Sequence, residues 1–289
     1  MSQKMLSTEL IKSVSEILKN NGIKEAVKKA EIILSEITKK KIPDLYLDEE
    51  EISSRTIKKY IEYLNKIIEG IPLQYIIKKS DFYKYQFYVD KGVFIPRPET
   101  EILIEKTIEI YKNFFFPSFV NILDIGTGSG NIAITLGKEI KNSSLIATDI
   151  SEKSIKIAKK NAARYKVENK IKFIKTDLFP KKNIKFDIIV SNPPYIPERE
   201  IENLENDVKK EPYIALNGGK SGMKYIKKIL KNSGKYLSNN GFLILEIGYN
   251  QSKFLKNKKF NDLKIVEFTN DLNGIERVVI FKKHNKKEE

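Results

Sequence analysis

The sequence predicts an α/β protein: a doubly wound, mostly parallel sheet with an antiparallel terminal hairpin, preceded by a small N-terminal helical bundle and a β-hairpin linker. Three observations lead to this prediction. From Phe119 onward, short apolar runs alternate with segments of helical periodicity. A glycine-rich turn, Gly126 to Gly130, follows the first of these runs. Before Gly70 the apolar residues follow helical spacing alone.

The N-terminal section predicts three helices. Asn20-Asn21-Gly22 ends the first, Ile42-Pro43 and Tyr46-Leu47-Asp48 predict a break after the second, and Ser53 or Ser54 is placed to cap the third. Each helix has one apolar face: Leu10, Ile11, Val14, Ile17 and Leu18; then Val27, Ala30, Ile33, Leu34 and Ile37; then Ile57, Tyr60, Ile61, Leu64, Ile67 and Ile68. This bundle carries no polar constellation, so we expect domain 1–78 to serve substrate recognition, with structural support as the alternative.

Residues 79–98 predict a β-hairpin linker. The run 81–89 is aromatic and extended, and Asp90-Lys91-Gly92 supplies a turn before the run 93–95. A helix then begins near Glu99 and Glu101 and continues to Ile108, with carboxylates suited to the positive end of its dipole. Capping does not explain Arg97, which stands between two prolines and is predicted to contact substrate.

The domain 99–289 carries the alternating pattern that predicts the sheet. The residues predict strands at 120–125, 144–148, 171–175, 186–190 and 242–245, and helices at 131–136, 151–165, 221–237 and 251–255. Two closing runs, 263–268 and 277–281, are expected to pair through a turn at Asn273-Gly274.

The composition excludes several kinds of chemistry. With no cysteine among the 289 residues, disulfides, thiolate metal sites and a cysteine nucleophile are excluded. The single histidine, His284, lies in a polar tail, 282–289, that we expect to be frayed, so no metal site is predicted. No apolar run is long enough to span a membrane, and Met1-Ser2-Gln3-Lys4 leads into an amphipathic pattern rather than a signal peptide. We expect a cytoplasmic protein.

The formal charge of +15 is spread along the chain. One interpretation is a general bias toward lysine at surface positions. The other is a surface that attracts an acidic or RNA-associated partner. Because the charge is not clustered with aromatic residues, it does not identify a nucleic-acid site.

The turn Asn192-Pro193-Pro194-Tyr195 follows the buried run 186–190. Two prolines in succession cannot continue a strand ladder, since each lacks a backbone N–H. The chain therefore leaves the sheet abruptly, with an amide, free carbonyls and an aromatic ring at the carboxyl end of a strand, where open α/β sheets bind ligands.

Three acidic residues mark a nucleotide-like site. Asp124 precedes the turn Gly126-Thr127-Gly128-Ser129-Gly130, which fits neither a dinucleotide fingerprint nor a P-loop. Asp149 ends the next strand, at a position where an acidic residue binds the ribose of an adenosine ligand. Asp177 lies beside Leu178 at the end of the third strand, where its carboxylate can accept a hydrogen bond from an adenine amino group.

This combination resembles the class I S-adenosylmethionine-dependent methyltransferase family. The resemblance implies that S-adenosyl-L-methionine is the cofactor and that the glycine turn wraps its methionine end. It also implies that Asp149 binds the ribose and that Asp177 and Leu178 flank the adenine. Asp124 and Asn192 complete the expected cofactor-binding set.

Within that family, Asn-Pro-Pro-Tyr resembles enzymes that methylate a planar nitrogen. The Asn192 side-chain oxygen and the Pro193 carbonyl can accept its two N–H bonds, and Tyr195 can stack on the planar group. Asn192, Pro193 and Tyr195 are therefore the expected catalytic residues, and the same three with Pro194 and Arg97 the expected substrate-binding residues. The sulfonium supplies the leaving group, so no strong general base is needed.

The whole chain resembles the release-factor glutamine methyltransferases. The matching segments, in chain order, are Pro72-Leu73-Gln74-Tyr75-Ile76, the aromatic hairpin, Phe94-Ile95-Pro96-Arg97-Pro98-Glu99-Thr100-Glu101, Asn192 to Tyr195, Glu211-Pro212 with Ala215-Leu216, Gly218-Gly219, and Glu246-Ile247-Gly248. The resemblance implies N5-methylation of the glutamine in the Gly-Gly-Gln motif of peptide chain release factors, with the helical domain gripping the factor.

Other functions stay open from the sequence. A ribosomal-protein glutamine methyltransferase shares the catalytic motif. An adenine-N6 nucleic-acid methyltransferase is compatible with the motif and charge, although no separate base-recognition domain is evident. A non-catalytic cofactor-binding module is disfavoured because Asn192 and Tyr195 are both present. We expect release factors as the protein partner, no required nucleic acid, no membrane association and a monomer.

Overall fold

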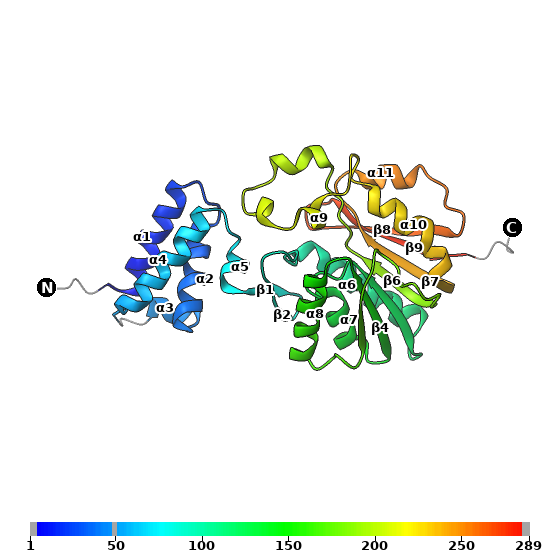
Figure 1. Ribbon diagram of the computed structural model, residues 1–289, viewed down its shortest axis with the longest axis horizontal. Helices are drawn as coiled ribbons and strands as arrows, with labels where there is room; N and C mark the ends of the chain where they lie inside the picture. The colour runs from blue at the N-terminus through cyan, green and yellow to red at the C-terminus, as the bar shows by residue number, and fades with distance from the viewer. Residues whose placement is uncertain (1–4, 48–50, 285–289) are drawn as a thin grey trace. The chain divides into compact units, whose positions relative to one another are not determined.

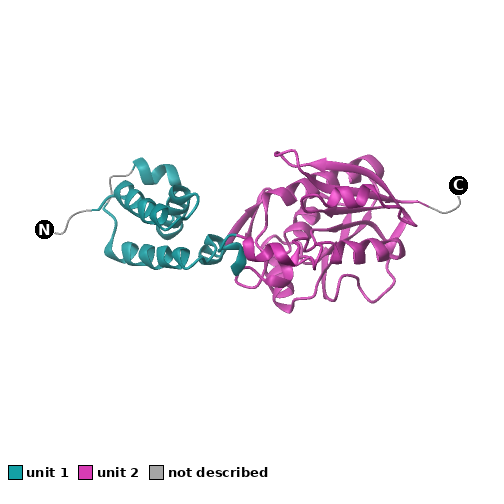
Figure 2. Cartoon of the chain, turned by 90° about the horizontal axis from the view of Figure 1, so that it is seen from above, with its two compact units in different colours: residues 1–78, 205–210 teal, residues 79–204, 211–289 magenta. Residues whose placement is uncertain are grey.

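The computed structural model describes residues 5–47 and 51–284, which form two compact units. The first unit comprises the residues up to Lys78 together with Glu205–Lys210, and the second comprises Lys79–Leu204 and the residues from Glu211 onward (Figure 2). The predicted start at Met1 to Lys4, Asp48 of the predicted break and the last residues of the predicted frayed tail lie outside the described residues.

The first unit is a helical bundle around its own apolar core. Its helices are α1 (Ser7–Asn20), α2 (Ala26–Thr38), α3 (Ile42–Leu47), α4 (Ser54–Ile68) and α5 (Leu73–Ile77). Tyr60 is fully buried there, and its hydroxyl donates a hydrogen bond of 2.8 Å to the Ala30 carbonyl. The Ser53 side chain caps α4 by accepting a hydrogen bond from the Thr56 N–H. Of the two predicted caps, Ser53 and Ser54, Ser53 is therefore the one that the structure uses.

Two short helices were not expected from the sequence. The predicted break contains α3, because Pro43 is tolerated in a first helical turn and Leu45 is buried against the bundle. The residues after Pro72 form α5, in which Leu73 and Ile76 join the bundle core. The prediction of a break at Ile42-Pro43 and Tyr46-Leu47 was therefore wrong, because burial of Leu45 favours helical structure there.

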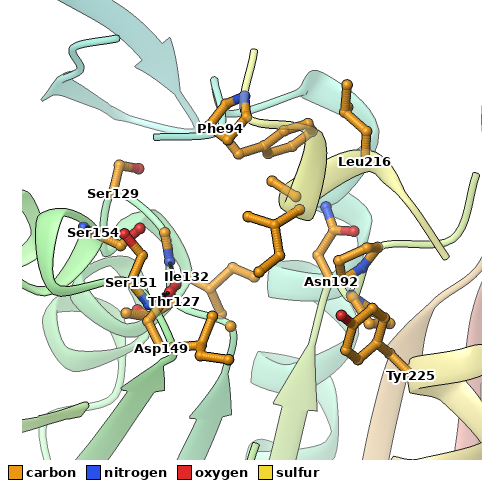
Figure 3. Close-up of a pocket in the computed structure, with 18 of the residues that line it drawn as sticks. Phe94, Thr127, Ser129, Ile132, Asp149, Ser151, Ser154, Asn192, Leu216 and Tyr225 are labelled. Atoms are coloured by element: carbon orange, nitrogen blue, oxygen red, sulfur yellow. Dashed lines mark hydrogen bonds between the residues drawn. The ribbon is translucent and has the colours of Figure 1, made fainter. Parts of the chain in front are cut away.

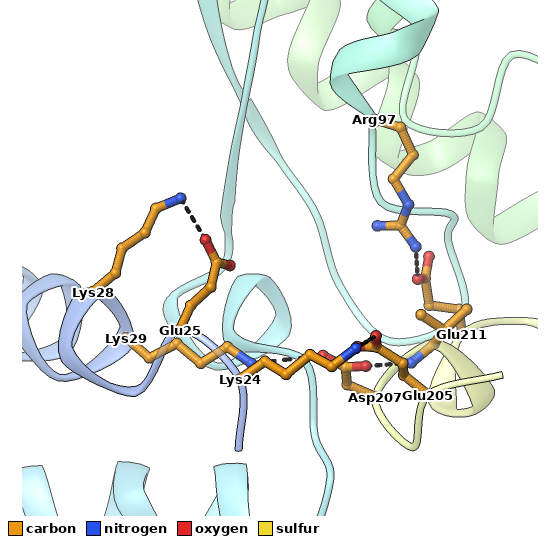
Figure 4. A network of polar contacts seen from close by, with 9 residues as sticks. Lys24, Glu25, Lys28, Lys29, Arg97, Glu205, Asp207 and Glu211 are labelled. Carbon is orange, nitrogen blue, oxygen red and sulfur yellow. Dashed lines mark hydrogen bonds and ion pairs between the residues drawn. The ribbon is translucent and has the colours of Figure 1, made fainter. Parts of the chain in front are cut away.

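The segment Glu205–Lys210 belongs to the helical unit although its sequence neighbours do not. Lys24 Nζ lies 2.6 Å from a Glu205 carboxylate oxygen, and Lys29 Nζ lies 3.8 Å from one of Asp207 (Figure 4). The hydrogen bond to Glu205 raises the pKa of Lys24. Two lysines of the first unit thus hold a segment that follows the Asn-Pro-Pro-Tyr turn by ten residues or so.

The second unit is built on a seven-stranded sheet in the order β5-β4-β3-β6-β7-β9-β8, in which only β9 runs antiparallel to both of its neighbours. The predicted doubly wound sheet with a terminal hairpin is confirmed. The elements are β1 (Lys79–Phe82), β2 (Tyr85–Tyr88), η1 (Pro98–Thr100), α6 (Glu101–Phe114), β3 (Val120–Ile125), α7 (Asn131–Glu139), β4 (Ser143–Asp149), α8 (Glu152–Arg164), β5 (Ile171–Lys175), β6 (Phe186–Ser191), η2 (Glu198–Asn203), α9 (Tyr213–Leu216), α10 (Lys224–Tyr236), β7 (Leu237–Glu246), α11 (Gln251–Lys256), β8 (Leu263–Asn270) and β9 (Glu276–Lys283), with η3 (Val208–Lys210) in the first unit.

Helices cover both faces of the sheet (Figure 1). Successive residues of a strand enter opposite cores: Ile188 packs in the core with α6 and α7, whereas Ile189 packs in the core with α10 and α11. This explains why the central strands are continuous apolar runs rather than alternating ones. Among the described residues, no helix has both the length and the apolar character needed to cross a membrane.

The aromatic hairpin has a different register from the predicted one. Its strands are β1 and β2, joined at Tyr83 and Lys84, and residues 93–95 form no strand. This pairing buries Phe82 and Phe87 on one face, with their rings 6.0 Å apart. The predicted turn at Asp90-Lys91-Gly92 instead ends the hairpin. Helix α6 also runs past the expected Ile108 to Phe114.

Candidate active site

A cleft opens at the carboxyl ends of the parallel strands, on the second unit alone (Figure 3). The strand order reverses at β3, with β4 on one side and β6 on the other, so the cleft lies at the topological switch point. The strand ends are level there, because Ile125 pairs with Thr148 of β4 and with Ser191 of β6. The cleft contains about 1140 Å³ of unfilled space, solvent at its mouth included.

Most of the predicted site residues line this cleft. They are Gly126, Thr127, Gly128, Ser129, Asp149, Asp177, Leu178, Asn192, Pro193, Pro194 and Tyr195. Asp124, Gly130 and Arg97 do not line it. In Figure 3, Asn192 stands across the opening from Asp149 and Ser151, and Phe94 lies at the rim.

The glycine turn adopts a backbone that favours glycine at each of three positions. Gly126, Gly128 and Gly130 have φ of 77°, 55° and 85°. A Cβ at Gly130 would approach Ile134 and Ala158 to about 3 Å, so this glycine lets α7 and α8 pack closely. A Cβ at Gly126 or Gly128 would meet nothing within 4 Å. These two positions therefore leave open backbone surface toward the cleft.

Asp149 ties the turn to the next strand. Its carboxylate accepts hydrogen bonds from the Gly128 N–H at 2.9 Å and from the Ser151 N–H at 2.8 Å. Burial raises the pKa of Asp149, and these N–H groups partly offset that effect. The Ser151 side chain in turn caps α8 by accepting a hydrogen bond from the Ser154 N–H. The carboxylate is thus held rigidly at the cleft wall.

Asp177 and Leu178 form the far end of this wall. Leu178 has φ of 63°, and its carbonyl accepts from the Thr148 hydroxyl at 2.6 Å, which fixes the turn after β5. Asp177 stays half-exposed, 3.6 Å from Lys228 Nζ. An apolar side chain and an adjacent carboxylate therefore lie together at one end of the cleft.

The Asn-Pro-Pro-Tyr turn is held by contacts on every side. The Ser191 hydroxyl before it donates to the Ile125 carbonyl at 2.7 Å. Asn192 Nδ2 donates to Thr100 Oγ1 at 2.9 Å, and the Tyr195 hydroxyl lies 3.2 Å from Glu246 Oε1. The Tyr195 carbonyl accepts from Gln251 Nε2 at 2.9 Å. The turn is thus pre-organised by four separate elements of the unit.

Thr100 and Glu246 were not among the predicted site residues. Both are 1% exposed, and they meet the turn from η1 and from the end of β7. The only sequence signal was their position in two of the segments that resemble the family. Burial raises the pKa of Glu246 to about 7, against the lowering effect of the Thr100 and Tyr195 hydroxyls.

Arg97 does not project into the cleft. Its guanidinium pairs with the buried Glu211 carboxylate and lies 4.9 Å from the centre of the Phe94 ring. The other Glu211 oxygen accepts from the Ile95 N–H at 2.9 Å. Arg97 thus orders the strap 93–97 at the rim (Figure 4), and its predicted contact with substrate stays a prediction.

Family models match both parts of the chain. The PrmC N-terminal domain matches residues 9–77, and the methyltransferase small domain matches residues 85–210. A protein named release factor glutamine methyltransferase from Fusobacterium nucleatum is 42% identical over 94% of this chain and 78% of its own length. The chain belongs to the release factor glutamine methyltransferase family.

A further relative agrees with this assignment, and a solved structure shares the fold. The release factor glutamine methyltransferase of Thermodesulfovibrio yellowstonii is 39% identical over 89% of this chain and 92% of its own length. The hMettl16 catalytic domain, solved with the MAT2A 3′UTR hairpin 6, has a TM-score of 0.55 at 16% identity and covers 69% of this chain and 76% of that one. That likeness concerns the fold alone. The protein is an S-adenosylmethionine-dependent methyltransferase.

The cleft suits a cationic nucleoside cofactor. Asp124 is fully buried behind the glycine turn; its Oδ2 accepts from the Thr127 hydroxyl at 2.6 Å, and its Oδ1 has no hydrogen-bond partner among the described residues. Burial raises its pKa to about 7. A carboxylate in this position fits a ligand with positive charge. No group of His, Asp and Glu side chains in the described part of the chain could hold a metal ion.

Cofactor affinity is therefore expected to rise with pH through about 7. The Asp124 carboxyl is neutral below its raised pKa, and a cation binds the ionised form better, so the Kd of S-adenosylmethionine at pH 6 should exceed that at pH 8 by ~5- to 10-fold. Isothermal titration calorimetry at both pH values tests this. Asp124→Asn should remove the difference, whereas Asp187→Asn, near the start of the neighbouring strand β6 and away from the cleft, should keep it. An unchanged pH dependence in Asp124→Asn would refute the assignment.

Proposed function

We propose that the protein transfers the methyl group of S-adenosylmethionine to the side-chain amide N5 of the glutamine in the Gly-Gly-Gln motif of peptide chain release factors. Its relatives from two organisms carry the name release factor glutamine methyltransferase at 42% and 39% identity. The observation that supports this reaction most directly is the position of Asn192, level with the glycine turn and on the opposite side of the same cleft.

The arrangement supports a positioning mechanism. An amide nitrogen is a weak nucleophile because its lone pair is delocalised into the carbonyl, so correct placement against the methyl group matters most. The Asn192 side-chain oxygen and the Pro193 carbonyl accept the two N–H groups, and the Tyr195 ring covers the planar amide. When bound along the glycine turn and Asp149, S-adenosylmethionine would supply an electrophilic methyl group with a neutral thioether as leaving group. The methylated nitrogen then loses one proton to water.

The two units have different roles in this reaction. The helical domain, 1–78, binds the release factor, the segment 79–98 connects it, and the domain 99–289 holds cofactor and glutamine. The apolar rim residues of the cleft, among them Phe94, Pro212 and Ile214, suit a backbone loop with glycines better than a charged nucleotide. The enzyme acts in the cytoplasm as a monomer and needs no nucleic acid.

The substrate is tested with labelled S-adenosylmethionine and separate acceptors. The acceptors are a release factor, the same factor with the motif glutamine replaced by alanine, a ribosomal protein and duplex DNA. We expect label in the intact release factor alone. Label in the ribosomal protein would make the chain a ribosomal-protein glutamine methyltransferase, and label in DNA would make it an adenine methyltransferase. Label in the glutamine-free factor would overturn the proposed acceptor atom.

A further inference from the structure

Glu246 is a buried carboxylate that the mechanism above does not use. It ends β7, next to β6, and its side chain lies under the Asn-Pro-Pro-Tyr turn rather than in the cleft lining. Oε1 lies 3.2 Å from the Tyr195 hydroxyl, and Oε2 has no hydrogen-bond partner among the described residues. Burying a carboxylate is unfavourable unless it is well paired, so this position calls for an explanation.

Thr100 connects this carboxylate to Asn192. The Thr100 hydroxyl lies beside Glu246 and lowers its pKa, and the same oxygen accepts from Asn192 Nδ2 at 2.9 Å. A hydroxyl has one proton to donate. When Glu246 is ionised it can only accept, so the Thr100 proton points to Glu246 and the Thr100 lone pair receives the Asn192 NH₂ group. The Asn192 oxygen is then the part of the amide left for a ligand.

Protonation of Glu246 removes this constraint. A neutral carboxyl can donate to Thr100, whose own proton is then free to point at the Asn192 amide. Asn192 could turn its oxygen to Thr100 and present NH₂ to the cleft, where it would oppose the N–H groups of an incoming amide. The ionised form of Glu246 thus selects the one amide orientation that accepts a hydrogen bond from substrate.

We propose that Glu246 is a positioning residue, which acts through the Thr100 hydroxyl to hold the Asn192 amide with its oxygen toward the acceptor nitrogen. The proposal rests on the methyl transfer at Asn192 proposed above. The other groups around Glu246 are Arg277 of β9, which favours its ionised form, Glu99 of η1, which opposes it, and Tyr195, which stays protonated because burial raises its pKa. Ionisation of Glu246 is therefore balanced near neutral pH, with the active form at higher pH.

Variants of Thr100 and Glu246 test the chain of contacts. Thr100→Val and Glu246→Gln should each lower kcat by ~10- to 50-fold with the Kd of S-adenosylmethionine unchanged, since the loss lies in orientation of the acceptor. The wild-type kcat should fall as the pH drops below about 7, and Glu246→Gln should lack this fall. Thr100→Ser, which keeps the hydroxyl, should recover most of the rate lost in Thr100→Val. The double variant should be no slower than the slower single variant.

A matched control separates this role from packing. Thr107→Val removes another buried hydroxyl of the same region, one that donates to the Leu103 carbonyl, and should leave kcat unchanged. Full activity in Thr100→Val, or additive losses in the double variant, would overturn the proposal. If Glu246→Gln does not fold, as judged by cofactor binding, the Thr100 series and the wild-type pH profile still decide it. Failure of the wild-type enzyme to label any release factor would instead contradict the proposed function.

Discussion

Asn192→Ala is expected to lower kcat for methyl transfer to a release factor by ~10²- to 10³-fold, the loss typical of removing a group that positions the reacting atom. The variant removes the side-chain oxygen that accepts from the substrate nitrogen, and leaves the glycine turn, Asp124 and Asp149 in place. The Kd of S-adenosylmethionine should therefore stay within ~2-fold of wild type, less than the ~1 kcal/mol that one lost hydrogen bond is worth. Single-turnover kinetics with saturating cofactor, together with calorimetry, measure the two quantities separately.

Asn232→Ala serves as the control for this variant. Asn232 lies on α10, where its amide donates to the Lys228 carbonyl, and it does not line the cleft. Its kcat and cofactor affinity should match those of the wild type. If Asn192→Ala instead weakened cofactor binding as much as it lowered the rate, Asn192 would be chiefly a cofactor ligand, and the acceptor site would lie elsewhere.

The central sheet was predictable because its signals are local. Strand β6 is a β-branched run that two prolines end, and β3 is an apolar run that a glycine turn ends. The residues that end each strand thus follow it directly in the sequence. The closing hairpin was predictable for the same reason, since Asn273-Gly274 marks its turn and β8 pairs with β9 as expected. The carboxyl ends of these strands bring the cleft residues together without further information.

The parts that sequence reasoning missed depend on contacts between distant segments. Glu246 reads as the end of an apolar strand, and only the packing of β7 beside β6 brings it under Tyr195. The hairpin register depends on which residues the core needs to bury, and Phe82 and Phe87 decided it against the stronger turn signal at Asp90 to Gly92. The assignment of Glu205–Lys210 to the helical unit is likewise a tertiary result, with no local sequence mark.

Gly218 and Gly222 pack closely against the backbone of Tyr195 in the Asn-Pro-Pro-Tyr turn. A Cβ built on Gly218 would lie 2.6 Å from the Gly222 carbonyl oxygen and 2.8 Å from the Tyr195 carbonyl carbon. Both are backbone atoms, which cannot rotate away as a side chain would. The Gly218 N–H also donates to the Ile196 carbonyl at 2.8 Å, so the two segments are already in direct contact. Tyr195 can therefore occupy its position only because residue 218 has no side chain.

Gly218→Ala is accordingly expected to displace the turn and lower kcat by ~10²-fold, the cost of a misplacement of about 1 Å at a reacting centre. It should also lower the free energy of unfolding by ~1–3 kcal/mol, as overpacking does. The control is Gly137→Ala in α7, where a Cβ would meet only side chains at 3.5 Å or more. Because alanine favours a helix more than glycine, that variant should be stabilised by up to ~1 kcal/mol with kcat unchanged. Thermal unfolding and steady-state kinetics on both proteins give the comparison, and equal behaviour of the two would show that the turn does not depend on Gly218.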